Sequence, residues 1–268
     1  KWEAVVFFFC GFKTLRSPVY WLVCRLWQSP LLTCVLQCNN GTILKPIIKE
    51  SQKREIDFYT TVNESTDEEL QELQKFIPRY YGCRLFEYHG YEQRYLVLED
   101  LAERMLEPCI MDVKMGKRTW DPLATEQKIQ NERAKYAACK QEFGFCIPGY
   151  QVHRLANGKL YRYDKDYGKK LHGQMVKTAI RNFLNGVGSP LCRALILQFL
   201  SSLWRVQQWA ARQTRVKLYS ASLLLAYDAA RVRECCGDQK DSWYVFWVVA
   251  GSLVELWANY VTLLLAIL

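Results

Sequence analysis

The pattern of apolar and polar residues predicts strands and helices that are mixed through the middle of the chain. Short apolar runs that end in turn residues predict strands at residues 42–45, 95–98, 110–113 and 222–227. An apolar stripe with helical spacing predicts a long amphipathic helix over residues 196–217. A capping box at residues 65–68 precedes apolar residues at helical spacing, so a second helix is expected to begin there. This mixture of elements predicts the α+β class.

Two further strands are predicted on either side of a turn. Residues 152–155 and 160–163 flank Asn157-Gly158, a dipeptide typical of the type I′ turn, in which both central residues need a positive φ. The sequence therefore predicts a β-hairpin at this point.

The two ends of the chain differ in composition from the middle. Residues 1–38 are rich in tryptophan, cysteine, phenylalanine and leucine, show no helical or strand period, and are assigned no function. Residues 243–268 carry one charged side chain, that of Glu255, and form an apolar run long enough to cross a membrane. Three interpretations of this tail are open: a membrane anchor, a buried core segment, or a sequence that does not belong to the domain.

The chain is basic, with a formal net charge of +9. Such a charge favours an anionic partner, which could be nucleic acid, an acidic membrane or a phosphorylated small molecule. The eleven cysteines form no CxxC pair and the three histidines lie far apart, so no structural zinc site is expected. The odd number and irregular spacing of the cysteines also argue against a disulfide framework, and reduced thiols are typical of cytosolic and nuclear proteins.

The most informative stretch is the predicted strand that carries Asp112 and Lys114. Residues two apart on a strand face the same side, so this carboxylate and this ammonium are expected to point into one cleft. Such a pair suits a site that must hold hydroxyls, magnesium and phosphate together. Gly116 follows and lets the backbone bend or approach a ligand closely.

The sequence around this pair, PCIMDVKMGKRTWDP, matches the PxxxDxKxG signature of the inositol polyphosphate kinases and is most similar to their multikinase branch. The resemblance continues in unbroken order over residues 39–229, through the segments GTILKP, REIDFY, LVLED, QKIQNERAKY, GFCIPGYQV, DYGKKL and YSASLLLAYD. It implies a two-lobed, protein-kinase-like ATP-binding fold with an inositol-phosphate-binding helical insertion. The N-lobe and hinge would cover residues 39–101 and the C-lobe residues 102–229, which leaves 1–38 and 230–268 unassigned.

On the ATP side, the resemblance implies a role for each residue that matches a family motif. Lys45 would contact the ATP phosphates, and Glu55 would steady Lys45 as an ion pair. The backbone carbonyl of Glu99 and the amide of Leu101 would bond the adenine edge in the hinge. Asp112 would hold the nucleotide ribose and shape the catalytic site.

On the substrate side, the resemblance places Lys114 between the donor phosphate and the accepting hydroxyl, as the main catalytic residue. Arg54 is similar to a residue that contacts a substrate phosphate. Lys169 stands where the family often has an arginine, so the charge is kept but the bidentate fork is lost.

Lys128 and Lys135 match the family's inositol-binding helix. They are seven residues apart, so they are expected to share one helix face that binds substrate phosphates. Glu132 lies on the same predicted face, where the multikinases carry an amide. A carboxylate there would repel phosphates unless it pairs with a lysine.

The sequence departs from the family pattern near both ends. Residues 1–38 lack the glycine- and histidine-containing segment that covers the nucleotide, and no IDF segment with a magnesium-binding aspartate follows Asp228. The only later aspartates, Asp238 and Asp241, stand in no matching context, so the metal ligand is unknown.

Two functions therefore compete. The first is an ATP- and magnesium-dependent kinase that phosphorylates inositol trisphosphate and tetrakisphosphate. The second is a non-catalytic module that binds inositol phosphates or phosphoinositide headgroups. No nucleic-acid partner is expected, because the basic residues lie in ligand-site motifs. The expected location is cytoplasmic or nuclear, or a membrane if residues 243–268 form a genuine tail anchor.

Overall fold

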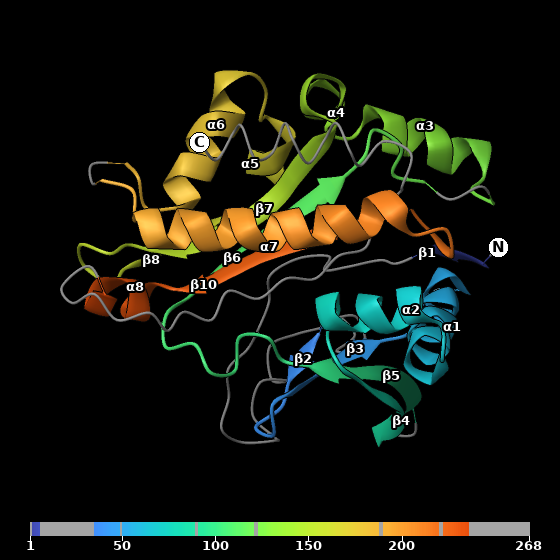
Figure 1. The fold of residues 1–268 in the computed structure, drawn as a ribbon. Coiled ribbons are helices and arrows are strands. Elements are labelled where there is room, and N and C mark those ends of the chain that lie inside the picture. Colours follow the sequence, from blue (N-terminus) through green and yellow to red (C-terminus); the bar gives the residue numbers. More distant parts are fainter. Residues whose placement is uncertain are drawn as a thin grey trace.

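Two antiparallel four-stranded sheets divide the described chain into two lobes (Figure 1). The computed structural model describes residues 2–5, 35–48, 50–88, 91–120, 123–187, 190–219 and 222–235. The predicted α+β class and two-lobed architecture are confirmed. The domain boundaries remain a prediction, because much of residues 1–38 and 230–268 lies outside the described residues.

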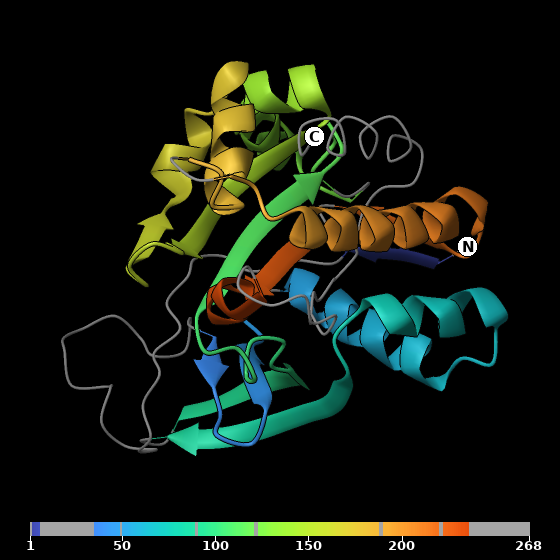
Figure 2. The ribbon, with the colours of Figure 1, turned by 60° about the vertical axis from the view of Figure 1, so that its left-hand side comes forward.

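The N-terminal lobe combines one sheet with two helices (Figure 2). Its strands, in the order β2-β3-β5-β4, are β2 (Leu36–Gln37), β3 (Thr42–Pro46), β5 (Tyr91–Glu99) and β4 (Tyr80–Tyr88). Its helices are α1 (Glu50–Glu64) and α2 (Glu68–Leu73), which the short 3-10 turn Gln74–Phe76 extends. Consecutive residues of β5 are apolar because both faces are covered: Leu96 and Leu98 belong to the main core with α1, whereas Val97 packs on the other face.

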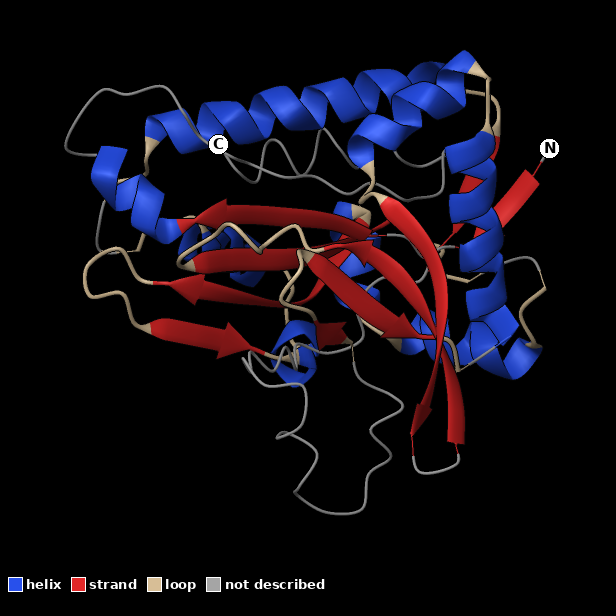
Figure 3. Cartoon of the chain, turned by 90° about the horizontal axis from the view of Figure 1, so that it is seen from below, coloured by secondary structure: helices blue, strands red, loops and turns tan. Residues whose placement is uncertain are grey.

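The C-terminal lobe is built on the second sheet, with the order β10-β6-β7-β8. Its strands are β6 (Pro108–Met115), β7 (Phe145–His153), β8 (Leu160–Tyr163) and β10 (Ser222–Asp228). Its helices are α3 (Glu126–Ala134), α4 (Ala137–Phe143), α5 (Lys165–Lys169), α6 (Gln174–Phe183), α7 (Arg193–Arg212) and α8 (Ala229–Cys235). The long helix α7 lies along this sheet and buries an apolar stripe that includes Phe199, Leu203 and Val206 (Figures 1 and 3).

The predicted strands and the long helix are present, but α7 ends earlier than the sequence pattern indicated. The side chain of Gln213 accepts hydrogen bonds from the backbone N–H groups of Arg215 and Val216, at 3.1 and 3.0 Å, and donates to the Val216 carbonyl at 3.2 Å. These bonds replace the backbone hydrogen bonds that would continue the helix, and they form a turn into β9 (Val216–Tyr219). Val216, which the sequence pattern placed in the helix, therefore belongs to a strand.

The hairpin and the capping box were each predicted with one wrong detail. β7 and β8 form the hairpin, but residues 154–159 connect them, and only Gly158 of the Asn157-Gly158 pair has a positive φ, so a two-residue type I′ turn is wrong. At α2, the N-cap is Asp67, whose carboxylate accepts from the N–H groups of Glu69 and Leu70. Ser65 accepts only the Asp67 N–H, because the helix begins later than the predicted capping box.

Strands β1, β2, β4 and β9 were not predicted. β1 (Trp2–Val5) pairs in parallel with β9 from the C-terminal lobe. Such a contact between distant segments leaves no local period in the sequence. None of the described helices is long and apolar enough to cross a membrane, and the predicted anchor at residues 243–268 lies outside the described residues.

Hydrogen bonds and ion pairs join α2 to the end of α7 and the turn beyond it. Trp209 donates from its indole N–H to the Glu69 carbonyl at 2.9 Å, and the Thr214 N–H donates to the Glu69 carboxylate at 2.8 Å. The guanidinium of Arg215 lies 2.8 Å from the Asp67 carboxylate. The two lobes are thus held together away from the sheet edges.

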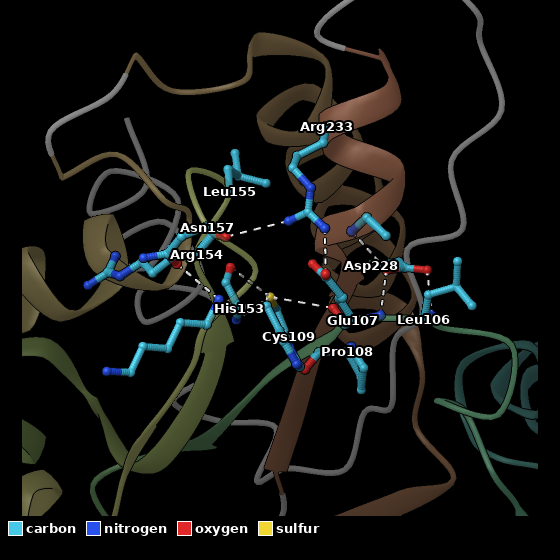
Figure 4. A network of polar contacts seen from close by, with 12 residues as sticks. Leu106, Glu107, Pro108, Cys109, His153, Arg154, Leu155, Asn157, Asp228 and Arg233 are labelled. Carbon is cyan, nitrogen blue, oxygen red and sulfur yellow. Dashed lines mark hydrogen bonds and ion pairs between the residues drawn. The ribbon is translucent and has the colours of Figure 1, made fainter.

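A second set of contacts fixes the segment that leads from the N-terminal lobe into β6 (Figure 4). The buried carboxylate of Asp228 accepts the backbone N–H groups of Leu106 and Glu107, at 2.8 and 2.9 Å. Arg233 of α8 pairs with the Glu107 carboxylate at 2.5 Å and donates to the Arg154 carbonyl at 3.4 Å. The start of β6 is therefore tied to the end of β10 and to the β7–β8 connection.

Helix α5 packs directly on β7 because Gly168 stands at the point of closest approach. A Cβ on Gly168 would lie 2.4 Å from the Ile147 carbonyl oxygen, which is shorter than real Cβ contacts. Gly149 of β7 allows a second close approach, since a Cβ there would lie 2.7 Å from the carbonyl oxygen of Tyr163 at the end of β8. These contacts fix α5 and its N-cap, Asp164, against the sheet.

We expect Gly168→Ala to lower the free energy of unfolding by about 2 kcal/mol, because the added methyl group must push α5 away from β7. Urea denaturation measures this loss. The matched control is Lys170→Ala at the exposed end of the same helix, which should change stability by no more than about 0.5 kcal/mol. Equal stability of the two variants would contradict the close packing.

Candidate active site

A buried ion pair joins the sheet of the N-terminal lobe to α1. The ammonium of Lys45 on β3 lies 2.8 and 2.7 Å from the two carboxylate oxygens of Glu55, which confirms the predicted pair. Lys45 is 9% exposed and Glu55 is 1% exposed. Burial raises the pKa of Glu55, while the charges of Lys45 and Lys114 oppose that rise. The pair holds the Lys45 ammonium at a fixed position under the sheet.

Asp112 and Lys114 stand on β6 and face the same side, as predicted. The Lys114 ammonium lies 3.9 Å from the Asp112 carboxylate and donates a hydrogen bond to the Ser222 hydroxyl at 3.0 Å. Val113 between them is fully buried in the core. The charge of Lys114 in the C-terminal lobe opposes the rise in the pKa of Glu55 in the N-terminal lobe.

The Asp112 carboxylate is buried, and its ion pair with Lys114 leaves its oxygens without a close hydrogen-bond donor. Its residue is 2% exposed, and neither carboxylate oxygen has a hydrogen-bond partner among the described residues. Burial raises the pKa of Asp112, and the Lys114 charge, the Ser222 hydroxyl and the Lys165 charge oppose the rise. A buried group that can only accept, and that lacks a donor, fits a ligand hydroxyl or a cation.

The expected hinge lies directly after β5. The Asp100 N–H donates to the Gly41 carbonyl at 2.8 Å, and the Asp100 carboxylate accepts the Ala102 N–H at 2.9 Å. These bonds fix the turn that carries the backbone of Glu99 and Leu101. The adenine contacts assigned to these two residues remain a prediction.

The lysines of the expected inositol-binding helix do not share one helix face. Lys128 lies within α3, but α3 ends at Ala134, and Lys135 follows it with an extended backbone. Tyr136 then adopts a left-handed conformation with φ 55°, which ends the helix. The shared face was wrong because this local break leaves no mark in the seven-residue spacing.

Glu132 is paired rather than open to the substrate. Its carboxylate lies 2.8 Å from the Lys135 ammonium and accepts the Thr119 hydroxyl at 3.2 Å. The condition set by the sequence, that this carboxylate needs a lysine partner, is therefore met.

Two other predicted substrate residues lie on separate elements. Arg54 precedes Glu55 on α1 and is half-buried. Lys169 is exposed on α5, where its ammonium pairs with Asp166 at 2.8 Å. Their contacts with substrate remain predictions.

The structure adds Ser222 and Lys165 to the site, and the sequence analysis missed both. Ser222 lies opposite Lys114 in the β10–β6 register and holds its ammonium. Lys165 begins α5, whose N-cap Asp164 lies beside Gly149, the register partner of Asp112. Ser222 lies in a segment that matches the family, and Lys165 directly precedes another such segment. The position of both residues in or beside family motifs could therefore have identified them as site residues.

The described residues contain no cluster of three or more side chains that could hold a metal ion. Among the described residues, Asp112 supplies the buried carboxylate whose two oxygens both lack a hydrogen-bond partner. This arrangement fits a cation that takes most of its ligands from nucleotide phosphates. Asp238 and Asp241 lie outside the described residues.

A cavity of about 750 Å³ lies between the lobes beside the expected hinge. Its lining includes the hinge residues Glu99 and Leu101 together with Tyr59 and Arg205, but not Lys45, Asp112 or Lys114. The cavity is therefore distinct from the cluster of buried charges.

A lysine–glutamate pair in a small sheet-based lobe and a second lobe with an Asp–Lys strand define a two-lobed, kinase-like fold. A solved inositol phosphate multikinase from S. cerevisiae, in complex with ADP and Mn2+, shares this fold with a TM-score of 0.64 at 22% identity, covering 84% of this chain and 97% of that one. Another solved inositol phosphate multikinase matches with a TM-score of 0.60 at 23% identity, covering 80% and 97%.

The sequence comparisons establish the family. The family model for inositol polyphosphate kinase matches residues 95–246. The inositol polyphosphate multikinase of Mus musculus is 32% identical over 199 residues, which covers 73% of this chain and 50% of the relative. The chain belongs to the inositol polyphosphate kinase family. It spans about half the length of the curated multikinase relatives from mouse, rat and human that it matches.

We expect Glu55→Leu to lower the free energy of unfolding by about 3 kcal/mol, because it leaves the Lys45 ammonium buried without its partner. The double variant Lys45→Met/Glu55→Leu should recover most of that loss, since it removes both charges. Chemical denaturation of the two single variants and the double variant gives the coupling energy. Additive effects would show that the pair does not interact in the folded protein.

We also expect Asp112→Asn to stabilise the protein at pH 7 by about 1 kcal/mol, because burial disfavours the Asp112 charge more than Lys114 stabilises it. The raised pKa of Asp112 means that the folded state favours the protonated carboxyl. The cost of the charge is therefore absent below the ordinary pKa of 3.8 and present above the raised one, so the advantage of the amide should shrink as the pH falls. Thermal unfolding of both proteins across this pH range measures the difference. A constant difference would refute the assignment.

Proposed function

We propose that this chain transfers the γ-phosphoryl group of ATP to a hydroxyl of an inositol phosphate. The observation that carries the proposal is the presence of two lysine–carboxylate pairs, Lys45–Glu55 in one lobe and Asp112–Lys114 in the other, with the Lys114 charge opposing the rise in the pKa of Glu55. Membership of the inositol polyphosphate kinase family supports the same activity. We further propose inositol trisphosphate and tetrakisphosphate as substrates.

Phosphoryl transfer needs positioning and charge stabilisation more than covalent chemistry. Lys45 would neutralise the donor phosphates from a position that Glu55 fixes. Lys114 would stabilise the charge on the transferring group, with its ammonium held by Ser222 and Asp112. The Asp112 carboxylate would accept a hydrogen bond from a ribose hydroxyl or act as one ligand of magnesium. Bound magnesium would neutralise the charge on the terminal phosphates of ATP.

The substrate phosphates would meet cations from three elements. Arg54 lies on α1, Lys128 and Lys135 lie in and just after α3, and Lys169 lies on α5. Several separate cations suit a ring that carries several phosphates. No described feature supports a phosphoinositide headgroup or a membrane as the partner. We propose a cytoplasmic or nuclear location.

The test incubates the purified chain with labelled ATP, magnesium and either inositol trisphosphate or tetrakisphosphate. Transfer is expected, and Lys114→Ala should lower it by about 100-fold or more, because the charge at the transferring group is lost. The matched control is Lys177→Ala on the exposed face of α6, which should keep full activity. Inositol-phosphate binding without transfer would instead favour the non-catalytic module.

A further inference from the structure

Helix α3 lacks the apolar anchor that holds most surface helices. None of its residues is buried, whereas α6 and α7 each bury an apolar stripe. A short helix gains most of its stability from packing an apolar face, so α3 must be held by other contacts. Its position matters because Lys128 and Lys135 depend on it.

Polar contacts to Lys140 and Thr119 supply this anchor. Lys140 lies on the next helix, α4, and is 3% exposed, as is Thr119 in the segment after β6. The Lys140 ammonium donates to the backbone carbonyl of Glu132 at 2.5 Å and to the Thr119 hydroxyl at 3.4 Å. The Thr119 hydroxyl donates in turn to the Glu132 carboxylate at 3.2 Å.

The bond between Lys140 and the Glu132 carbonyl lies at the C-terminal end of α3. Carbonyl groups in the last helical turn lack partners within the helix, and the helix dipole favours a cation there. The two helices are separated by the left-handed residue Tyr136. The Lys140 ammonium thus links α4 to the last turn of α3 across this residue. The same turn carries Glu132, whose carboxylate binds the Lys135 ammonium.

A second contact secures the neighbouring residue of the same turn. The guanidinium of Arg133 lies over the ring of Trp120, 5.3 Å from its centroid. Trp120 directly follows Thr119, so both contacts join α3 to one short segment after β6. This segment leads out of the strand that carries Asp112 and Lys114, and α3 is therefore held in a fixed relation to those residues.

We propose that Lys140 is a positioning residue that orients Lys128 and Lys135 toward the phosphates of the inositol-phosphate substrate. The inference rests on the proposed function, since it assigns these lysines to substrate binding. It gives Glu132 a defined role: the carboxylate orders Lys135 and links α3 to Thr119. Lys140 itself is buried and does not need to touch the substrate.

The charges around Lys140 distinguish this role from a contribution to core stability. Burial lowers the pKa of Lys140, and Lys135 adds to the effect, whereas Cys146, Glu132 and Cys139 oppose it. A buried ammonium is therefore a costly way to stabilise the core. Replacing it with an apolar side chain of similar length should release α3 and leave the rest of the fold intact.

The experiment compares Lys140→Met and Thr119→Val with the unchanged chain and with Lys177→Met, an exposed lysine on α6. Amide hydrogen exchange is measured on the unliganded proteins. Residues 126–134 should exchange about tenfold faster or more in Lys140→Met, with a smaller increase in Thr119→Val, because these amides open locally once the anchor is lost. Residues of β6 and α7 should exchange at the unchanged rate.

Kinetics on the same proteins then test the link to substrate. The KM for inositol trisphosphate should rise about tenfold in Lys140→Met, while the KM for ATP stays the same, because only substrate binding depends on α3. Unchanged exchange in α3 would overturn the anchor. Faster exchange with an unchanged KM, or a rise in both KM values, would overturn the positioning role. An unchanged chain that neither binds nor phosphorylates inositol phosphate would disprove the proposed function, and the exchange data would still decide whether Lys140 anchors α3.

Discussion

The buried ion pair between Lys45 and Glu55 is the interaction on which the position of the site depends. It joins β3 to α1, and both partners are almost fully shielded from water. Such a pair is favourable only with good geometry, so the surrounding packing must hold both elements in place. Phe58 and Val62 supply that packing from the same helix. The charge of Lys114 in the other lobe also opposes the rise in the pKa of Glu55, so the two lobes are linked electrostatically.

The C-terminal lobe carries a cost of a different kind. Asp112 is buried without a hydrogen-bond donor, and α5 approaches β7 so closely that Gly168 admits no side chain. Both features lower stability relative to an apolar strand with an ordinary helix on it. The first leaves an acceptor for a ligand, and the second fixes α5, which begins at Lys165, against the sheet. The large apolar contact between α7 and the sheet offsets these costs.

The sequence predicted those parts of the fold whose cause is local. The apolar runs of β5 and β10 and the stripe of α7 were predictable from period alone, and the family motif gave Lys45, Glu55, Asp112 and Lys114. The sequence could not show that β1 pairs with β9, because that contact joins distant segments. It could not place the end of α3, which a left-handed residue sets, nor the end of α7, which one glutamine side chain sets. Lys140 was missed because a lysine in a polar helix is usually exposed.

The lysines of the site form two groups with different energetics. Lys45 and Lys140 are buried and held by fixed partners, so moving either one breaks bonds that water cannot replace. Lys135 and Lys169 are exposed, and each pairs with an acidic residue three positions earlier. Exposed pairs of this type contribute little to stability, so a phosphate can displace the carboxylate at little cost. Lys45 would therefore fix the position of the donor phosphates and Lys140 the position of α3, while the exposed lysines would adapt to the phosphates of different inositol rings.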